Sequence, residues 1–326
     1  MTTYKEVKGT NIEAVASDPS NPNNGQIWFN TTTNLVKGNI NYGAGSWATG
    51  GDLNRSSGRR FVSGTGTQTA AICVGGEPPV TANTELYNGS SWTEVNNLNT
   101  ARYGMAMSGT QTAAIVGGGG TSPANASAEV WNGTNWTEVN NLNQARRSLG
   151  GSTAGTSTAA LGFGGYKTPG IANNTEVWNG TNWTEVNNLG TARYRYGGSG
   201  TSTAALAWGG QAGSGGVNNT ELWNGTNWAE VNNLNNARQG VSGCGTQTAS
   251  LAFGGEPVPR QAKTESWNGT NWTNVADLGT ARYRLGGAGT NTAGLAFGGA
   301  VNPPGGRVSA TEEWNAGNLV TTFTDA

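Results

Sequence analysis

Arginine is the chemically active residue with the most regular placement in this chain. A guanidinium carries a rigid fork of donors that fits a carboxylate, so a ring of arginines could grip an anionic sugar. The structural alternative is stronger, because a residue present in every unit of a repeat commonly holds the units together, and each unit also supplies a glutamate. We therefore predict structural ion pairs or backbone contacts for these side chains. The arginines recur about every 44 to 47 residues as Arg59, Arg102, Arg146, Arg193, Arg238 and Arg282, and the candidate partners are Glu85, Glu129, Glu176, Glu221, Glu265 and Glu312.

Other side chains that commonly carry catalysis are missing or scattered. With no histidine, the chain cannot build a Ser-His-Asp or Cys-His pair or a histidine-ligated metal site. The aspartates are dispersed and the glutamates recur as strand residues, so no pair of glycosidase carboxylates stands out. Cys73 and Cys244 fall in repeats that do not adjoin, which predicts two free thiols. We predict a non-enzymatic protein without cofactor or metal.

The elements that position the arginines belong to an internal repeat. Each unit reads as Ala-Arg, a Gly-rich stretch, T-x-T-A, an apolar run ending in Gly-Gly, a variable loop, and then T-E-x-W-N-G-T-N-W-T-E-V-N-N-L. These are four strand signals in order, and the period fits one four-stranded blade of a β-propeller. Six blades are indicated by the Gly-Gly pairs that begin at Gly75, Gly118, Gly164, Gly209, Gly254 and Gly298.

The third and fourth strands of each unit are predicted to form a hairpin, because Asn-Gly between them suits a tight turn with positive φ. Five hairpins are complete, and the sixth is split between Trp314 and Trp47. An N-terminal strand around Trp47 would thus close the last blade and leave no unpaired sheet edge in the ring. A competing closure, in which the C-terminal tail replaces that strand, stays open.

Composition favours a core built from tryptophan. Leu, Ile, Val and Phe make up only about 15% of the residues, below the roughly 20% typical of an ordinary core. Disorder is disfavoured, because the net charge is -1 and the chain contains thirteen Trp. Near-neutral charge gives no reason to expect nucleic-acid binding. The absence of an apolar signal region and of any run of about eighteen apolar residues predicts neither secretion nor membrane insertion.

The two faces of the predicted propeller differ in sequence. The turns within strand pairs repeat almost unchanged, whereas the loops between second and third strands vary in length, charge and proline content. Variable loops on a repeated scaffold favour recognition, since loop changes leave the packed strands alone. The alternative is that the loop sequences vary only because no function constrains them. The candidate binding residues on this face are Glu77, Pro78, Tyr166, Lys167, Gln211, Glu256, Arg260, Asn302 and Arg307.

The repeat resembles the kelch repeat over roughly residues 45–317. The resemblance is carried by Gly-Gly closing the second strand, an aromatic residue after Glu in the third, and Trp opening the fourth. It implies an all-β fold, a six-bladed kelch-like β-propeller whose last blade is closed by an N-terminal strand. Kelch ancestry says little about function.

Residues 1–44 lie outside the repeat and contain GQIWFNTTTNLVKG, a predicted β-hairpin with Trp28 and Phe29 on its first strand. This stretch resembles the G-x-[IL]-W-[FY]-N-T-T-x-x-x-L segment of bacteriophage tail-fibre and other virion proteins, and the Gly/Asn/Thr-rich units are similar to virion proteins of marine phages. The resemblance implies a virion structural protein, made in the cytoplasm of a host bacterium and present in several copies on a particle. Residues 1–44 would attach to other virion proteins through Trp28 and Phe29, and residues 318–326 would form a tail.

Two functional hypotheses follow. In the first, the chain is a tail or capsid appendage that recognises a host-surface glycan or receptor through the variable loops. In the second, it is a purely structural decoration or connector protein that contacts neighbouring virion subunits. Burial of the loops against other virion proteins would favour the second hypothesis.

Overall fold

The chain is all-β in the computed structural model, which describes residues 13–17, 27–41, 45–55, 57–120, 123–257, 259–302 and 306–322. No α-helix occurs among these residues, so the all-β prediction is confirmed. The described part of the chain has no helix that is long and apolar enough to cross a membrane. Two compact units are present: Ser46–Asn315, and a second unit made of Met1–Gly45 with Ala316–Ala326.

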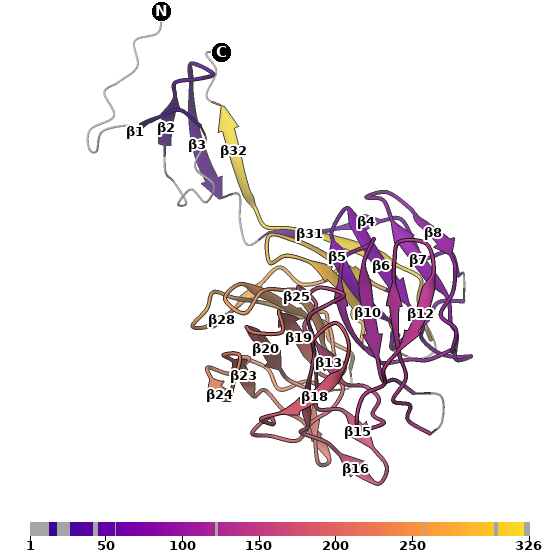
Figure 1. The fold of residues 1–326 in the computed structure, drawn as a ribbon. Helices are drawn as coiled ribbons and strands as arrows, with labels where there is room; N and C mark the ends of the chain where they lie inside the picture. The colour runs from indigo at the N-terminus through magenta and orange to yellow at the C-terminus, as the bar shows by residue number, and fades with distance from the viewer. Residues whose placement is uncertain are drawn as a thin grey trace, which may run out of the picture. The chain divides into compact units, whose positions relative to one another are not determined.

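Within its described residues, the Ser46–Asn315 unit contains six four-stranded antiparallel sheets (Figure 1). Short turns join the first strand to the second in five of the sheets and the third to the fourth wherever these are consecutive, whereas longer loops join the second to the third. The first three sheets are β5 (Ser63–Thr67), β6 (Ala70–Val74), β7 (Thr84–Tyr87) and β8 (Trp92–Val95); β9 (Ala106–Gly109), β10 (Ala114–Gly117), β11 (Ala128–Trp131) and β12 (Trp136–Val139); β13 (Gly150–Gly151), β14 (Ala160–Phe163), β17 (Thr175–Trp178) and β18 (Trp183–Val186).

The other three sheets follow the same order, but the last one takes its fourth strand from the N-terminal part of the chain. Strand β4 pairs with β31 over five residues, and Trp47 lies opposite Trp314. Two loops contain short hairpins, β15 (Tyr166–Lys167) with β16 (Gly170–Ile171) and β21 (Gln211–Ala212) with β22 (Gly215–Gly216). The fourth, fifth and sixth four-stranded sheets are β19 (Gly197–Gly200), β20 (Ala205–Trp208), β23 (Thr220–Trp223) and β24 (Trp228–Val231); β25 (Ser242–Gly245), β26 (Ser250–Phe253), β27 (Thr264–Trp267) and β28 (Trp272–Val275); β29 (Gly286–Gly289), β30 (Ala293–Phe297), β31 (Thr311–Asn315) and β4 (Ser46–Gly50).

The sheets are arranged in a propeller-like way. The first strands contact one another in the order β5, β9, β13, β19, β25 and β29, and β29 also contacts β5. These strands are rich in glycine and small residues, which lets their backbones approach closely around a common centre. The part of each sheet nearest the centre therefore packs against both neighbours.

Tryptophan fills the space between neighbouring sheets. The Trp131 and Trp136 rings lie 5.4 Å apart across their hairpin, and the Trp136 indole donates a hydrogen bond to Thr84 of the preceding sheet at 3.0 Å. Trp47 makes the corresponding bond to Thr264 at 3.1 Å. Strand β4 therefore occupies the position of a fourth strand in its sheet, as the Trp47 spacing predicts.

One sheet departs from this pattern for a reason visible in the sequence. Ala128 stands where the other third strands begin with threonine, and the facing indole nitrogen of Trp183 is buried without a hydrogen-bond partner. A buried indole N–H usually finds an acceptor. The missing hydroxyl of residue 128 explains the unsatisfied donor.

The other unit contains a four-stranded sheet in the order β1 (Glu13–Val15), β2 (Ile27–Asn30), β3 (Leu35–Asn41) and β32 (Asn318–Thr322). Strands β2 and β3 form an antiparallel hairpin, and β32 pairs antiparallel with β3. The C-terminal tail therefore contributes a strand beside the N-terminal hairpin, whereas β31 pairs with β4. Residues 1–12, 18–26 and 42–44 of the predicted attachment segment, and 323–326 of the predicted tail, lie outside the described residues.

Candidate functional site

The six repeated arginines form buried ion pairs with the glutamates that sequence analysis offered as partners. All six side chains are fully buried, so they do not present charge to a ligand. They fasten the segment before each first strand to the loop between the second and third strands: Arg59, for example, also donates hydrogen bonds to the carbonyls of Gly75 and Asn83 at 2.8 and 3.0 Å. The N–O distances are 2.7 Å for Arg59–Glu85, 2.6 Å for Arg102–Glu129, 2.6 Å for Arg146–Glu176, 3.0 Å for Arg193–Glu221, 2.9 Å for Arg238–Glu265 and 2.8 Å for Arg282–Glu312.

Each buried pair is balanced electrostatically. Burial lowers the pKa of the Arg102 guanidinium, and the charge of Glu129 opposes this shift. The second carboxylate oxygen of Glu129 accepts hydrogen bonds from the backbone and side chain of Asn99, at 2.8 and 2.9 Å. The glutamate therefore joins the buried arginine to the segment between two sheets.

A ring of residues lies two positions after these arginines and two positions before each first strand. Each backbone N–H of this ring donates to the carbonyl of the previous ring residue, and Phe61 donates to Arg284, so the described chain contains a closed cycle of hydrogen bonds of 2.7 to 3.0 Å. All members have φ between 51° and 63°. The ring consists of Phe61, Gly104, Ser148, Arg195, Gly240 and Arg284.

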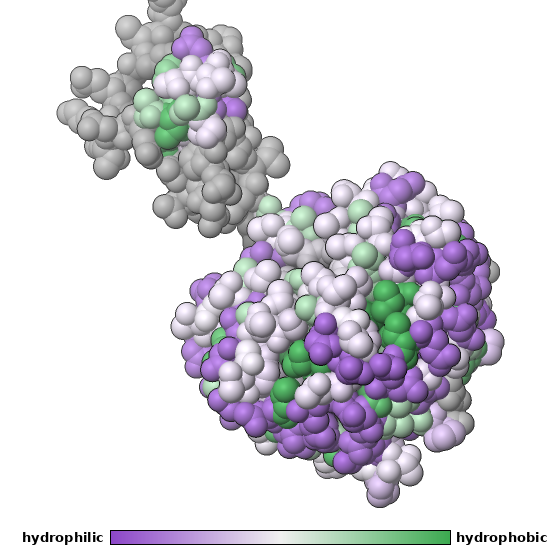
Figure 2. All heavy atoms as spheres, viewed as in Figure 1, coloured by the Kyte–Doolittle hydropathy of each residue, from purple (hydrophilic) through white to green (hydrophobic). Residues whose placement is uncertain are grey.

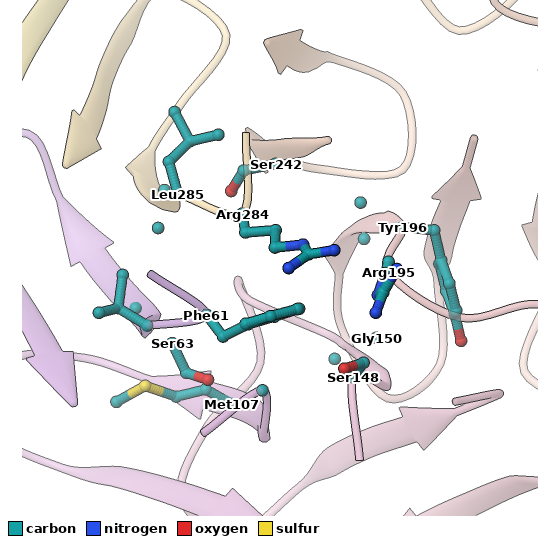
Figure 3. A pocket seen from close by; sticks show the side chains of 18 of the residues that line it. Phe61, Ser63, Met107, Ser148, Gly150, Arg195, Tyr196, Ser242, Arg284 and Leu285 are labelled. Atoms are coloured by element: carbon teal, nitrogen blue, oxygen red, sulfur yellow. The ribbon is translucent and has the colours of Figure 1, made fainter. Parts of the chain in front are cut away.

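Only glycine adopts this left-handed conformation without a steric penalty, so the other side chains in the ring are held under strain. The ring surrounds the mouth of a cavity of about 110 Å³, which we call the central cavity. Figure 3 shows Arg195 and Arg284 extending into it beside the ring of Phe61. Ser148, Met107 and Tyr196 also line it.

The central cavity ends a short distance along the first strands. Thr65 and Ser108 are buried there and donate hydrogen bonds to carbonyls of the next sheet, to Gly109 at 2.8 Å and Ser152 at 2.7 Å. Cys244 is also fully buried and donates to the Thr290 carbonyl at 3.3 Å. A ligand would therefore enter from the mouth and meet a packed layer of small polar side chains.

Two guanidiniums concentrate positive charge at the mouth. The Arg284 guanidinium carbon lies 4.5 Å from the centre of the Phe61 ring, and that of Arg195 lies 5.7 Å from it. Burial and the nearby charge of Arg195 lower the pKa of Arg284 to about 10. Arg284 lies 3.7 Å from a carboxylate oxygen of Glu256, whereas Arg195 donates to the neutral amide oxygen of Gln211 at 3.2 Å. The positive charge of this pair is only partly compensated.

A rim surrounds the mouth, formed by the residues just before the ring: Arg60, Tyr103, Arg147, Tyr194, Gln239 and Tyr283. Each rim residue forms a backbone bridge with the residue that follows a Gly-Gly pair, where a variable loop begins. The variable loops and the central cavity therefore share one face. Among the predicted binding residues, Glu77, Tyr166, Gln211 and Glu256 lie at these bridges.

Several predicted loop residues gather between the sheets of β25 and β29. Arg260 forms an ion pair with Glu256 at 2.9 Å, and its guanidinium lies 3.9 Å from the Tyr283 ring centre. Its backbone N–H donates to the side chain of Asn302 at 3.0 Å. Arg307 is exposed and lines a hollow with Arg260, Tyr283 and Arg60.

The remaining predicted residues lie apart from this group. Tyr166 stacks on Arg147, whereas Lys167 donates to the Gln144 side chain at 3.4 Å beside a separate hollow. Pro78 is partly exposed and does not line the central cavity. In the other unit, Trp28 is fully buried and Phe29 partly buried, so Trp28 does not offer its ring to a partner in this conformation.

Sequence reasoning missed Phe61, Arg195 and Arg284. The signal was their place two residues after the repeated arginine, where two repeats have glycine, one has serine and these three carry a bulky or charged side chain. The described residues contain no cluster of three or more Cys, Asp or Glu side chains that could hold a metal ion. No known family model matches the chain, and no curated protein has a significant sequence match to it.

Proposed function

We propose that this chain is a non-enzymatic virion appendage, and that its Ser46–Asn315 unit is a closed, six-bladed, kelch-like propeller that recognises a host-surface glycan. The observation that carries the recognition proposal is the shared face of the variable loops and a cavity lined by arginine and aromatic side chains. The cyclic hydrogen bonds and the β4–β31 pairing support closure of the ring. The virion assignment rests on the sequence resemblance of residues 1–44 and the repeats.

The surface chemistry supports a polar ligand. Among described residues, the large hydrophobic side chains that are exposed are Ile27 and Leu35, and both belong to the other unit. In the view of Figure 2, hydrophobic residues form small separate patches among hydrophilic ones. A stable apolar docking surface would be larger and contiguous. The loop face instead presents tyrosines, amides and arginines, which suit the hydroxyl and acidic groups of saccharides.

A blocking label can test which face binds. Burial raises the pKa of both native thiols, Cys73 and Cys244, to about 12, so maleimide should react only with an introduced cysteine. Gly215→Cys places one on the loop face, where a Cβ meets no atom within 4 Å. Ser90→Cys places one in the exposed turn between β7 and β8, at the opposite end of the strands.

We expect a bulky polyethylene glycol at position 215 to weaken adsorption to intact candidate host cells by about tenfold or more, equal to about 1.4 kcal/mol. The same label at position 90 should leave adsorption unchanged, and wild-type protein treated with the reagent is the control for stray labelling. Blocking by the position 90 label alone would contradict the proposal. Adsorption by none of the proteins, together with binding to purified virion proteins, would favour the connector function.

A further inference from the structure

We propose that Arg195 and Arg284 bind the carboxylate of an acidic sugar residue in the central cavity, beside the ring of Phe61. This inference rests on the proposed glycan recognition and names its ligand class. The residues come from three different sheets, and Figure 3 shows their side chains meeting at one mouth. The site therefore exists only when the sheets are assembled around the centre.

The fold does not need arginine at these positions. The backbone of Arg195 and Arg284 has φ of 58° and 56°, a region that favours glycine. Gly104 and Gly240 occupy the same ring position and make the same backbone hydrogen bonds. A long charged side chain held in an unfavourable conformation, where glycine suffices, points to function rather than to folding.

Uncompensated charge also points to a ligand. The Nε atoms of Arg195 and Arg284 have no hydrogen-bond partner in the described chain, but neither do those of the six repeated arginines, so charge rather than this feature distinguishes the pair. Arg195 has no ion pair with a carboxylate among the described residues, and Glu256 shares its charge between Arg284 and Arg260. A planar carboxylate accepts paired hydrogen bonds from a guanidinium, and Phe61 holds both guanidiniums in place through contacts with its ring.

The surrounding groups favour a sugar over an acidic peptide side chain. Ser148 and Ser242 also line the cavity, and their hydroxyls can exchange hydrogen bonds with the hydroxyls of a sugar. A sugar carries such hydroxyls beside its carboxylate, whereas an ionised Asp or Glu side chain has none. The cavity of about 110 Å³ has room for one small group, with the rest of the saccharide lying on the rim, where Arg60, Arg147 and Tyr194 are partly exposed.

The test uses the full chain and two acidic probes, a trimer of galacturonic acid and a sialylated trisaccharide. The binding of each acid is compared with that of its methyl ester. Esterification removes the charge but keeps the sugar. Wild-type protein should bind at least one acid, and its affinity for the ester of that acid, measured by calorimetry, should be about tenfold or more lower. The affinity of Arg195→Gly/Arg284→Gly for that acid should fall by at least a similar factor. The melting temperature of this variant should equal or exceed that of the wild type.

Lys37→Ala/Arg55→Ala is the matched control, because it removes two positive charges outside both the cavity lining and the variable loops and should keep wild-type binding. Binding to neither acid, equal binding of acid and ester, or unchanged binding by the glycine variant would overturn the inference. Tighter binding of a glutamate-rich peptide than of either saccharide would also overturn it. If the glycine variant still adsorbs to cells through the loop face, this inference fails while glycan recognition by that face stands.

Discussion

Arg146→Met is expected to lower the free energy of unfolding by about 3 to 5 kcal/mol. The substitution leaves Glu176 charged and buried, since the pair lies 2.6 Å apart with both side chains almost fully shielded from solvent. It also removes the donor to the carbonyls of Gly164 and Asn174, each 2.7 Å from the guanidinium. Urea unfolding followed by tryptophan fluorescence measures the loss.

Lys263→Met is the matched control for this substitution. Lys263 forms an ion pair with Asp277 at 3.1 Å, but the two side chains are 46% and 39% exposed. Solvent screens such a pair, so its loss should cost at most about 1 kcal/mol. Arg146→Met/Glu176→Leu should be less destabilised than Arg146→Met, because it removes both buried charges. Equal costs for Arg146→Met and Lys263→Met would contradict a structural function of the arginines.

Deletion of residues 1–50 should have the other large effect, because it removes β4 from its sheet. Strand β31 would keep β30 but lose β4 on its other side, and Trp47 would no longer pack 5.6 Å from Trp314 and 5.1 Å from Phe253. Trp47 is only partly buried, but its loss together with the β4–β31 pairing should cost about 3 to 5 kcal/mol, so the melting temperature should fall by roughly 10 °C or more. The exposed strand edge should also promote aggregation.

Deletion of residues 1–44 is the control, since it removes β1, β2 and β3 but retains β4. Its Ser46–Asn315 unit should melt within a few degrees of wild type, as measured by calorimetry with light scattering to detect aggregation. If both deletions melt at the same temperature as the full chain, β4 does not complete the last sheet in solution.

The repeated parts of the fold could be predicted because the residue types of the repeat each favour a particular local conformation or pairing. Asn132-Gly133 permits a tight turn, and the alternation around Trp131 and Trp136 sets one face of a hairpin. The pairing of β31 with the Trp47 strand followed from the missing half of one unit. Arg146 and Glu176 could be paired because six repeats offered the same combination.

The other parts could not be predicted, because they depend on the assembled backbone. The residues beside Arg195 and Arg284 in the chain do not signal a positive φ, which is imposed by the cycle of hydrogen bonds between sheets; only the glycines at the same position of two other repeats indicate it. The partial charge balance at the mouth depends on Glu256, which is far from Arg195 in the sequence. Strand β32 has no repeat pattern, so its pairing with β3 was not foreseen.

The most direct measurement is adsorption of the purified chain to intact candidate host cells, with soluble acidic oligosaccharide or its methyl ester as competitor. We predict that the acid inhibits adsorption and that the ester does so about tenfold less well or not at all. Wild-type protein that fails to adsorb to any candidate cell, while binding purified virion proteins through its loop face, would contradict host recognition.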